Sequence, residues 1–127
     1  MSYINDRVFD FGLNVLDTEA NRLDICHTEP STYTQATSTY SVGNKTGLSV
    51  GSPAAGSPNG RQVTIPAITD GVVTSTSTGS ADDAQYFAIT DTVNSRLLLA
   101  GPLAAAQMVT SGNTFTLTSF TYRQPSA

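Results

Sequence analysis

The stretch AQYFAITDTVNSRLLLA, residues 84–100, decides the fold. Residues 84–90 are apolar on both faces of an extended chain, which indicates a central strand of a sheet. Residues 91–94 have the composition of a turn, and residues 96–100 indicate a second, strongly buried strand. The sequence therefore predicts two buried strands joined by a turn. The pair Gly101-Pro102 is expected to interrupt the second strand before residues 103–109.

Upstream, residues 61–69 alternate apolar and polar side chains through Val63, Ile65 and Ala67. Asp70-Gly71 then supplies a two-residue hairpin signal, and residues 72–78 form the returning strand. This pattern predicts a β-hairpin centred on residues 70 and 71.

Downstream, Phe115 and Leu117 lie on one face of the last expected strand, but Phe120 and Tyr122 are one residue out of phase with them. A one-residue slip reverses the buried face of a strand. A bulge at residues 118–119 would restore the register, and we favour it. Without a bulge, the two later aromatic side chains would lie outside, at an interface.

The N-terminal part is the expected exception to the β pattern. Asn5 or Asp6 can cap a helix, and the apolar spacing favours one over residues 8–20. The alternation of residues 9–15 also fits a strand, so this alternative stays open. Residues 22–28 predict a short half-buried strand. Residues 31–60 predict a long irregular loop in which Val42, Leu48 and Val50 offer a strand or two, with a turn at 43–47.

The length of 127 residues suits one compact domain over residues 1–127. Its many Thr, Ser and Gly residues favour strands and turns over helices. The predicted fold is mainly β: a small antiparallel β-sandwich, favoured over a closed barrel, with one short N-terminal helix. Residues 1–7 and 123–127 are expected either to form extended arms across neighbouring subunits or to fray.

Composition excludes several classes of function. A net charge of −4 argues against a general nucleic-acid binder. One cysteine cannot form an internal disulfide. No run approaches the roughly 20 apolar residues of a membrane span, and the first residues lack the pattern of a signal peptide. No nucleic-acid or membrane partner is therefore expected.

Candidate chemical sites have simpler interpretations. The run Asp24-x-Cys26-His27-x-Glu29 contains metal-ligand types, but a strand points Cys26 and His27 to opposite sides, so no metal is expected. A hydrolase would have to use His27, the only histidine, and the sequence has no nucleophile elbow. Adjacent Asp82 and Asp83 fit a solvated turn, and residues 43–47 lack the spacing of a phosphate loop. We expect no enzyme activity, catalytic residue or cofactor.

Several segments resemble small structural proteins of tailed bacteriophages. They include VLDTEANRLDICHTEP at residues 15–30, GNKTG at 43–47, FAITD at 87–91 and SGNTFTLT at 111–118. The resemblance spans about residues 15–122 and implies a capsid cement or decoration protein. Its implied partner is the major capsid protein. The implied location is the capsid surface of the virion, after synthesis in the bacterial cytoplasm, and the resemblance transfers no site residues.

A cement protein must bridge neighbouring subunits, so we expect a homo-oligomer, with a trimer favoured. The candidate interface residues are two in the N-terminal segment, two loop tyrosines and one in the C-terminal tail: Tyr3, Ile4, Tyr33, Tyr40 and Arg123. Two alternatives stay open. One is a tail or baseplate component. The other is a receptor- or glycan-binding module that uses Tyr33, Tyr40 and the loop 51–60 to stack on sugars.

Overall fold

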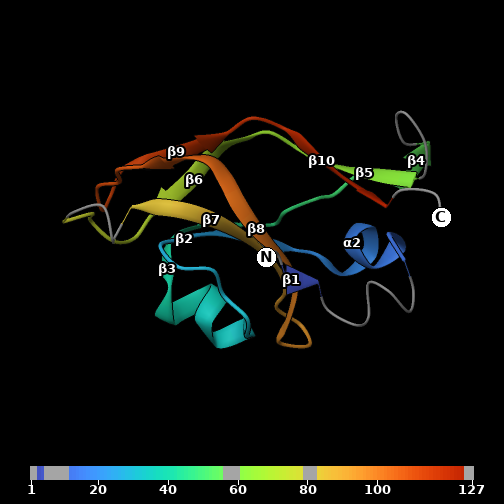
Figure 1. The fold of residues 1–127 in the computed structure, drawn as a ribbon, viewed down its shortest axis with the longest axis horizontal. Helices are drawn as coiled ribbons and strands as arrows, with labels where there is room; N and C mark the ends of the chain where they lie inside the picture. Colours follow the sequence, from blue (N-terminus) through green and yellow to red (C-terminus); the bar gives the residue numbers. More distant parts are fainter. Residues whose placement is uncertain (1–2, 5–11, 56–60, 79–82, 125–127) are drawn as a thin grey trace.

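The structure is a computed structural model that describes residues 3–4, 12–55, 61–78 and 83–124 (Figure 1). Most of this chain lies in two antiparallel sheets, which confirms the predicted mainly-β class. The larger sheet has the order β1 (Tyr3–Ile4), β8 (Arg96–Gln107), β7 (Ala84–Asp91), β2 (Arg22–Cys26), β3 (Ser41–Thr46), β6 (Ile68–Val73) and β9 (Thr114–Leu117). The smaller sheet has the order β10 (Phe120–Gln124), β5 (Arg61–Ile65) and β4 (Ala54–Ala55).

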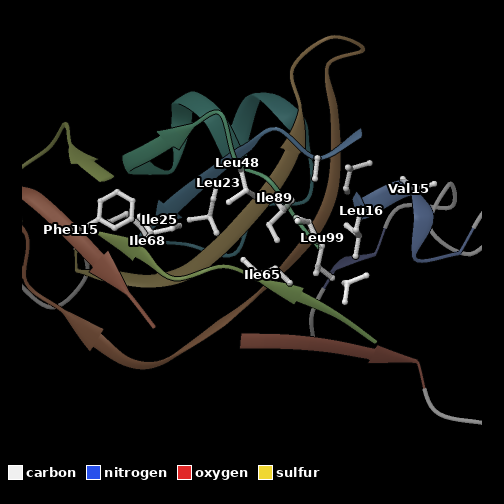
Figure 2. Close-up of a cluster of buried hydrophobic side chains, with 14 of the residues drawn as sticks. Val15, Leu16, Leu23, Ile25, Leu48, Ile65, Ile68, Ile89, Leu99 and Phe115 are labelled. Atoms are coloured by element: carbon white, nitrogen blue, oxygen red, sulfur yellow. The ribbon is translucent and has the colours of Figure 1, made fainter. Parts of the chain in front are cut away.

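The main core is a cluster to which both sheets and the helix contribute (Figure 2). Leu23 from β2, Ile89 from β7, Ile65 from β5 and Leu16 from the helix each have an exposed fraction of 0%. Burying an aliphatic side chain of this size stabilises a fold by about 1.5–3 kcal/mol. Ile89 and Leu99, from the strands predicted at residues 84–100, thus share one core with Ile65 of the smaller sheet.

The helix is shorter than predicted. α2 spans Asn14–Glu19 and buries Val15 and Leu16. Gly12 has a φ of +68°, a left-handed conformation that a continuing helix cannot adopt. The predicted helix over residues 8–20 is therefore wrong at residues 12–13, and its proposed caps, Asn5 and Asp6, lie outside the described residues.

A strand predicted at residues 22–28 is present as β2, the middle strand of the larger sheet, but it ends at Cys26 and is buried on both faces instead of one. Within the loop predicted at residues 31–60, the strand offered by Val42 is present as β3, whereas Leu48 and Val50 lie outside any strand. The region also contains β4 and a five-residue π-helix, η1 (Gln35–Thr39), which were not predicted. The predicted turn at 43–47 is wrong, because residues 43–46 belong to β3. A Cβ at Gly43 would lie 2.8 Å from the backbone oxygen of Val72, so glycine permits the close approach of β6.

The hairpin predicted at Asp70-Gly71 is also wrong. Both residues lie inside β6, and β5 belongs to the other sheet. The returning strand ends at Val73, well short of residue 78. Gly71 faces Phe115 of β9, and the phenyl ring occupies the space that a side chain at position 71 would need. Here glycine makes room for an aromatic ring and does not make a turn.

The strands on either side of residues 92–95 pair as β7 and β8, which confirms the central prediction. Gly101-Pro102 does not end β8. The register instead shifts: Pro102 pairs with Tyr86, and Gln107 with Ala84. Residues 103–106 therefore stand opposite the single residue Gln85 and form a wide bulge, called the β8 bulge below.

The pattern of buried residues does change near residue 118, as predicted, but the predicted bulge is wrong. β9 ends at Leu117 and pairs with β6, whereas β10 begins at Phe120 and pairs with β5. The chain changes sheets at residues 118–119 and forms no bulge within one strand. Phe120 then packs against Phe87, with ring centroids 4.8 Å apart.

Candidate binding surfaces

The terminal interface candidates lie in strands. Tyr3 and Ile4 pair with Ala100 and Leu99 as β1, at one edge of the larger sheet. Arg123 pairs with Gln62 in β10, at one edge of the smaller sheet. Gln124, the next residue of the predicted C-terminal arm, also lies in β10. The other residues of the arms predicted at 1–7 and 123–127 lie outside the described parts of the chain, so the arms stay a prediction there.

The two loop tyrosines lie on residues 31–40, a segment called the η1 cover below. It shields a second, smaller cluster formed by Cys26, Ala36, Ala88, Leu97 and Ala100. Tyr33 and Tyr40 are both half-buried. The Tyr40 ring packs against this cluster and meets the His27 ring edge-on, with centroids 5.5 Å apart. Tyr40 is therefore held by packing.

The structure does not bring the proposed glycan site together. The η1 cover, drawn in cyan, and β4 lie at opposite ends of the molecule (Figure 1). Tyr33 and Tyr40 therefore do not share a surface with residues 54–55. Residues 56–60 of that loop lie outside the described parts.

A buried ion pair fixes the η1 cover to the sheet. Asp24 has an exposed fraction of 0%, and Arg22 Nε and Nη2 donate to its two carboxylate oxygens at 2.7 and 2.9 Å. Ser41 Oγ donates to Oδ2 at 2.6 Å. Arg22 Nη2 also donates to the backbone oxygen of Thr37 at 3.3 Å, which ties the π-helix to β2. The arrangement is a structural clamp.

Electrostatics within the clamp follow from burial. Desolvation raises the pKa of Asp24, and the hydrogen bonds from Arg22 and Ser41 offset part of that effect. The hydrogen bond to Asp24 raises the pKa of Arg22. Desolvation, together with the nearby Asp24 charge, raises the pKa of Cys26 to about 12. The thiol is therefore protonated at neutral pH and is a poor nucleophile.

The remaining candidates give no reactive site in the described residues. His27 Nδ1 lies 2.8 Å from Thr28 Oγ1, and its ring contacts Tyr40. No group of three or more metal-ligating side chains occurs in the described parts. Asp82 lies outside them, so the Asp82 and Asp83 pair is not described.

A groove with a volume of about 510 Å³ opens between the β8 bulge and the crossover from β9 to β10. An adjoining hollow of about 260 Å³ continues it toward Val109 and Phe115. Apolar side chains dominate the groove, with neutral polar groups beside them, and none of its described lining residues is charged: Phe87, Leu103, Leu117, Phe120, Gln107 and Thr118. The change of sheets at residues 118–119 forms one wall of this groove.

The turn between β7 and β8 is a second surface that residue patterns missed. Val93 at its tip has an exposed fraction of 82%, and its neighbours Thr92, Asn94 and Ser95 are also exposed. The only sequence signal for the groove was the phase change before Phe120. No residue pattern singled out Val93.

With this geometry in view, the chain matches no protein-family model, no curated protein and no solved structure. Among the described residues, no helix has the length and apolar character that crossing a membrane requires. The mainly-β class is thus established by the structure alone.

Proposed function

We propose that this chain is a non-enzymatic structural protein of a tailed-phage virion. In this role it binds the outside of the capsid shell and stabilises contacts between major capsid subunits. The sequence resemblance over residues 15–122 suggested this role. The structural observation that carries it is the open strand edge of β10.

β10 is the outer strand of the smaller sheet and pairs with β5 on one side only, within the described residues. Its other side offers backbone donors and acceptors to a strand of a partner. Natural sheets often blunt such an edge with Lys or Pro, and Phe120–Gln124 contains neither. This edge is therefore suited to strand addition on a capsid surface.

The chemistry of the described surface also favours binding over catalysis. The only histidine has a hydroxyl and a tyrosine ring as its described side-chain neighbours, and the only cysteine is buried and protonated. Neither forms the nucleophile and base pair of a hydrolase.

The test compares filled heads with and without this protein. Heads lacking it should rupture at a lower temperature, and adding back the purified chain should restore the original value. Equal rupture temperatures with and without the protein would overturn the proposal.

A pair of proline variants tests the role of the β10 edge. Thr121→Pro, at an exposed position of β10, should bind heads more weakly. Thr34→Pro is the matched control on the η1 cover, distant from that edge: Thr34 is exposed, and its φ of −63° suits proline. It should bind heads like the wild type. Circular dichroism must first show that both variants fold.

A glycan-binding module is the second candidate, because Tyr33 and Tyr40 each keep part of their surface exposed on the η1 cover. Aromatic rings at a surface can stack on sugar rings, and Tyr33 lies on the same cover. Glycan-array binding that is lost in the Tyr33→Ala, Tyr40→Ala double variant would favour this candidate. A tail or baseplate location would instead show as a low copy number per particle.

A further inference from the structure

The tip of the β7–β8 turn presents an apolar side chain on a fixed backbone. Asp91, only 2% exposed, accepts hydrogen bonds from the backbone nitrogens of Val93 at 2.9 Å and Asn94 at 3.3 Å. Its other oxygen accepts one from Asn94 Nδ2 at 2.8 Å. The turn is thus held from inside by a buried carboxylate, while Val93 points into solvent.

The same turn is tied to the body of the protein. Asn21 Oδ1 accepts hydrogen bonds from Thr92 N at 3.0 Å and Thr92 Oγ1 at 3.1 Å. At the base of the turn, Arg96 Nη1 lies 3.6 Å from Glu19 Oε1 of α2. A surface that is already ordered loses little conformational entropy on binding, so this tip is suited to insertion into a partner.

The groove between the β8 bulge and the β9–β10 crossover complements this tip. The tip, residues 92–95, carries no charge, and no described residue lining the groove is charged. Gln107, Thr116 and Thr118 offer neutral hydrogen-bonding groups beside the apolar lining, matching Thr92 and Asn94 beside Val93. A charged partner segment would lose its hydration here without gaining an opposite charge.

Tip and groove cannot meet within one copy. The orange turn between β7 and β8 lies at the bottom of the molecule in Figure 1, whereas β9 and the start of β10 lie at the top. A tip on one side and a groove on the other generate a head-to-tail contact, which forms a closed ring when the rotation between copies permits it.

We infer that the Val93 tip of one copy docks into the groove of the next, and that this contact builds a head-to-tail homo-oligomer. The contact buries the isopropyl group among Phe87, Leu103 and Phe120 of the neighbouring copy. Phe120 is the first residue of β10, so the contact reaches the start of that strand, whereas Thr121 and Tyr122 do not line the groove. The inference does not depend on the capsid proposal, and the two can fail separately.

Analytical ultracentrifugation of the full chain over a wide concentration range tests this contact. The wild type should associate as its concentration rises. Val93→Asp places a charge on the tip, and Thr118→Asp places one in the groove; both positions are exposed. Each variant should weaken association about tenfold or more, the effect of losing one buried aliphatic contact. Ser49→Asp, exposed and outside both surfaces, should associate like the wild type.

Mixing the two variants gives the sharper result. Val93→Asp retains an intact groove and Thr118→Asp an intact tip, so an equimolar mixture should form a dimer of one copy of each and no ring. A wild type that stays monomeric throughout would overturn the inference. So would a mixture that does not pair, or a Val93→Asp variant that associates like the wild type.

Discussion

The ring of Phe115 in β9 lies over Gly71 in β6, its cross-strand partner, so that a Cβ at position 71 would overlap the ring. β9 has no neighbour on its other side within the described residues, and this contact fixes it to the larger sheet. It also holds the chain where it leaves for the smaller sheet. The position of the groove wall therefore depends on glycine at position 71.

Gly71→Ala should lower the free energy of unfolding by about 1–3 kcal/mol, because the new methyl group must displace the ring or the strand. Urea denaturation measures this change. Gly51→Ala is the matched control: its Cβ would lie 3.8 Å from the backbone oxygen of Thr64, an ordinary contact. If both variants were as stable as the wild type, the Phe115 ring would not occupy this position.

The buried Cys26 thiol should report opening of the η1 cover. With its pKa raised to about 12 and a weak hydrogen bond to the Ala36 oxygen at 3.5 Å, it should react very slowly with iodoacetamide at neutral pH. Denaturant should abolish this protection. A Ser49→Cys protein provides an internal control, since its exposed thiol should react quickly while Cys26 does not. Equal reaction rates for the two thiols in the folded protein would contradict the packing described for the cover.

Breaking the clamp should cost more than breaking a surface ion pair. Asp24→Asn places an amide NH2 donor where a carboxylate oxygen accepts hydrogen bonds from Arg22 or Ser41, and we expect a loss of about 1–3 kcal/mol in unfolding free energy from the buried groups left unpaired. Asp70→Asn removes the partner of Lys45, 3.0 Å away in an exposed pair, and should cost less than about 1 kcal/mol. Chemical denaturation of both variants gives the comparison. Similar losses in the two would contradict the clamp.

The pH dependence of the same variant has a definite sign. Because burial raises the pKa of Asp24, the folded protein binds a proton at this carboxyl group more tightly than the unfolded chain does. This difference stabilises the fold, and its contribution is complete below the ordinary carboxyl pKa. That contribution is lost as pH rises through the raised value. The stability difference between wild type and Asp24→Asn should therefore be largest at the acidic end of a pH series. A difference that grows with pH would mean that the pairing with Arg22 outweighs desolvation.

Ser95 in the β7–β8 turn has a φ of +55°, the only positive value at a described non-glycine residue. This conformation costs an L-residue roughly 1–2 kcal/mol, and glycine adopts it freely. Since glycine also adds entropy to the unfolded chain, Ser95→Gly should raise stability by a net of about 0.5 kcal/mol. Thermal unfolding tests this, with Ser49→Gly as a control that should not gain stability.

The sequence predicted the parts of the fold that depend on strong local patterns. Residues 84–100 are apolar over two complete strands, so their pairing and burial could be read directly. The turns predicted at Gly43 and Gly71 were wrong for one physical reason. Gly43 and Gly71 serve close contacts between strands far apart in sequence, and the same residue type signals a turn when only its neighbours along the chain are known.

The candidate surfaces were less predictable still. The phase change before Phe120 located the crossover, but a single sequence does not distinguish a bulge from a change of sheets. Val93 was not predicted as a surface contact, because an apolar residue in a turn carries no pattern of its own. The turn that carries it is tied to Asn21, distant in sequence, which accepts two hydrogen bonds from Thr92.

The measurement that tests the proposed function most directly is the copy number of this chain relative to the major capsid protein in purified particles, by quantitative mass spectrometry. A capsid cement protein should be present at a simple ratio to the major capsid protein, at a copy number of comparable size. A small copy number would move the chain to the tail or a single vertex. Absence from the particles would contradict a role in the virion.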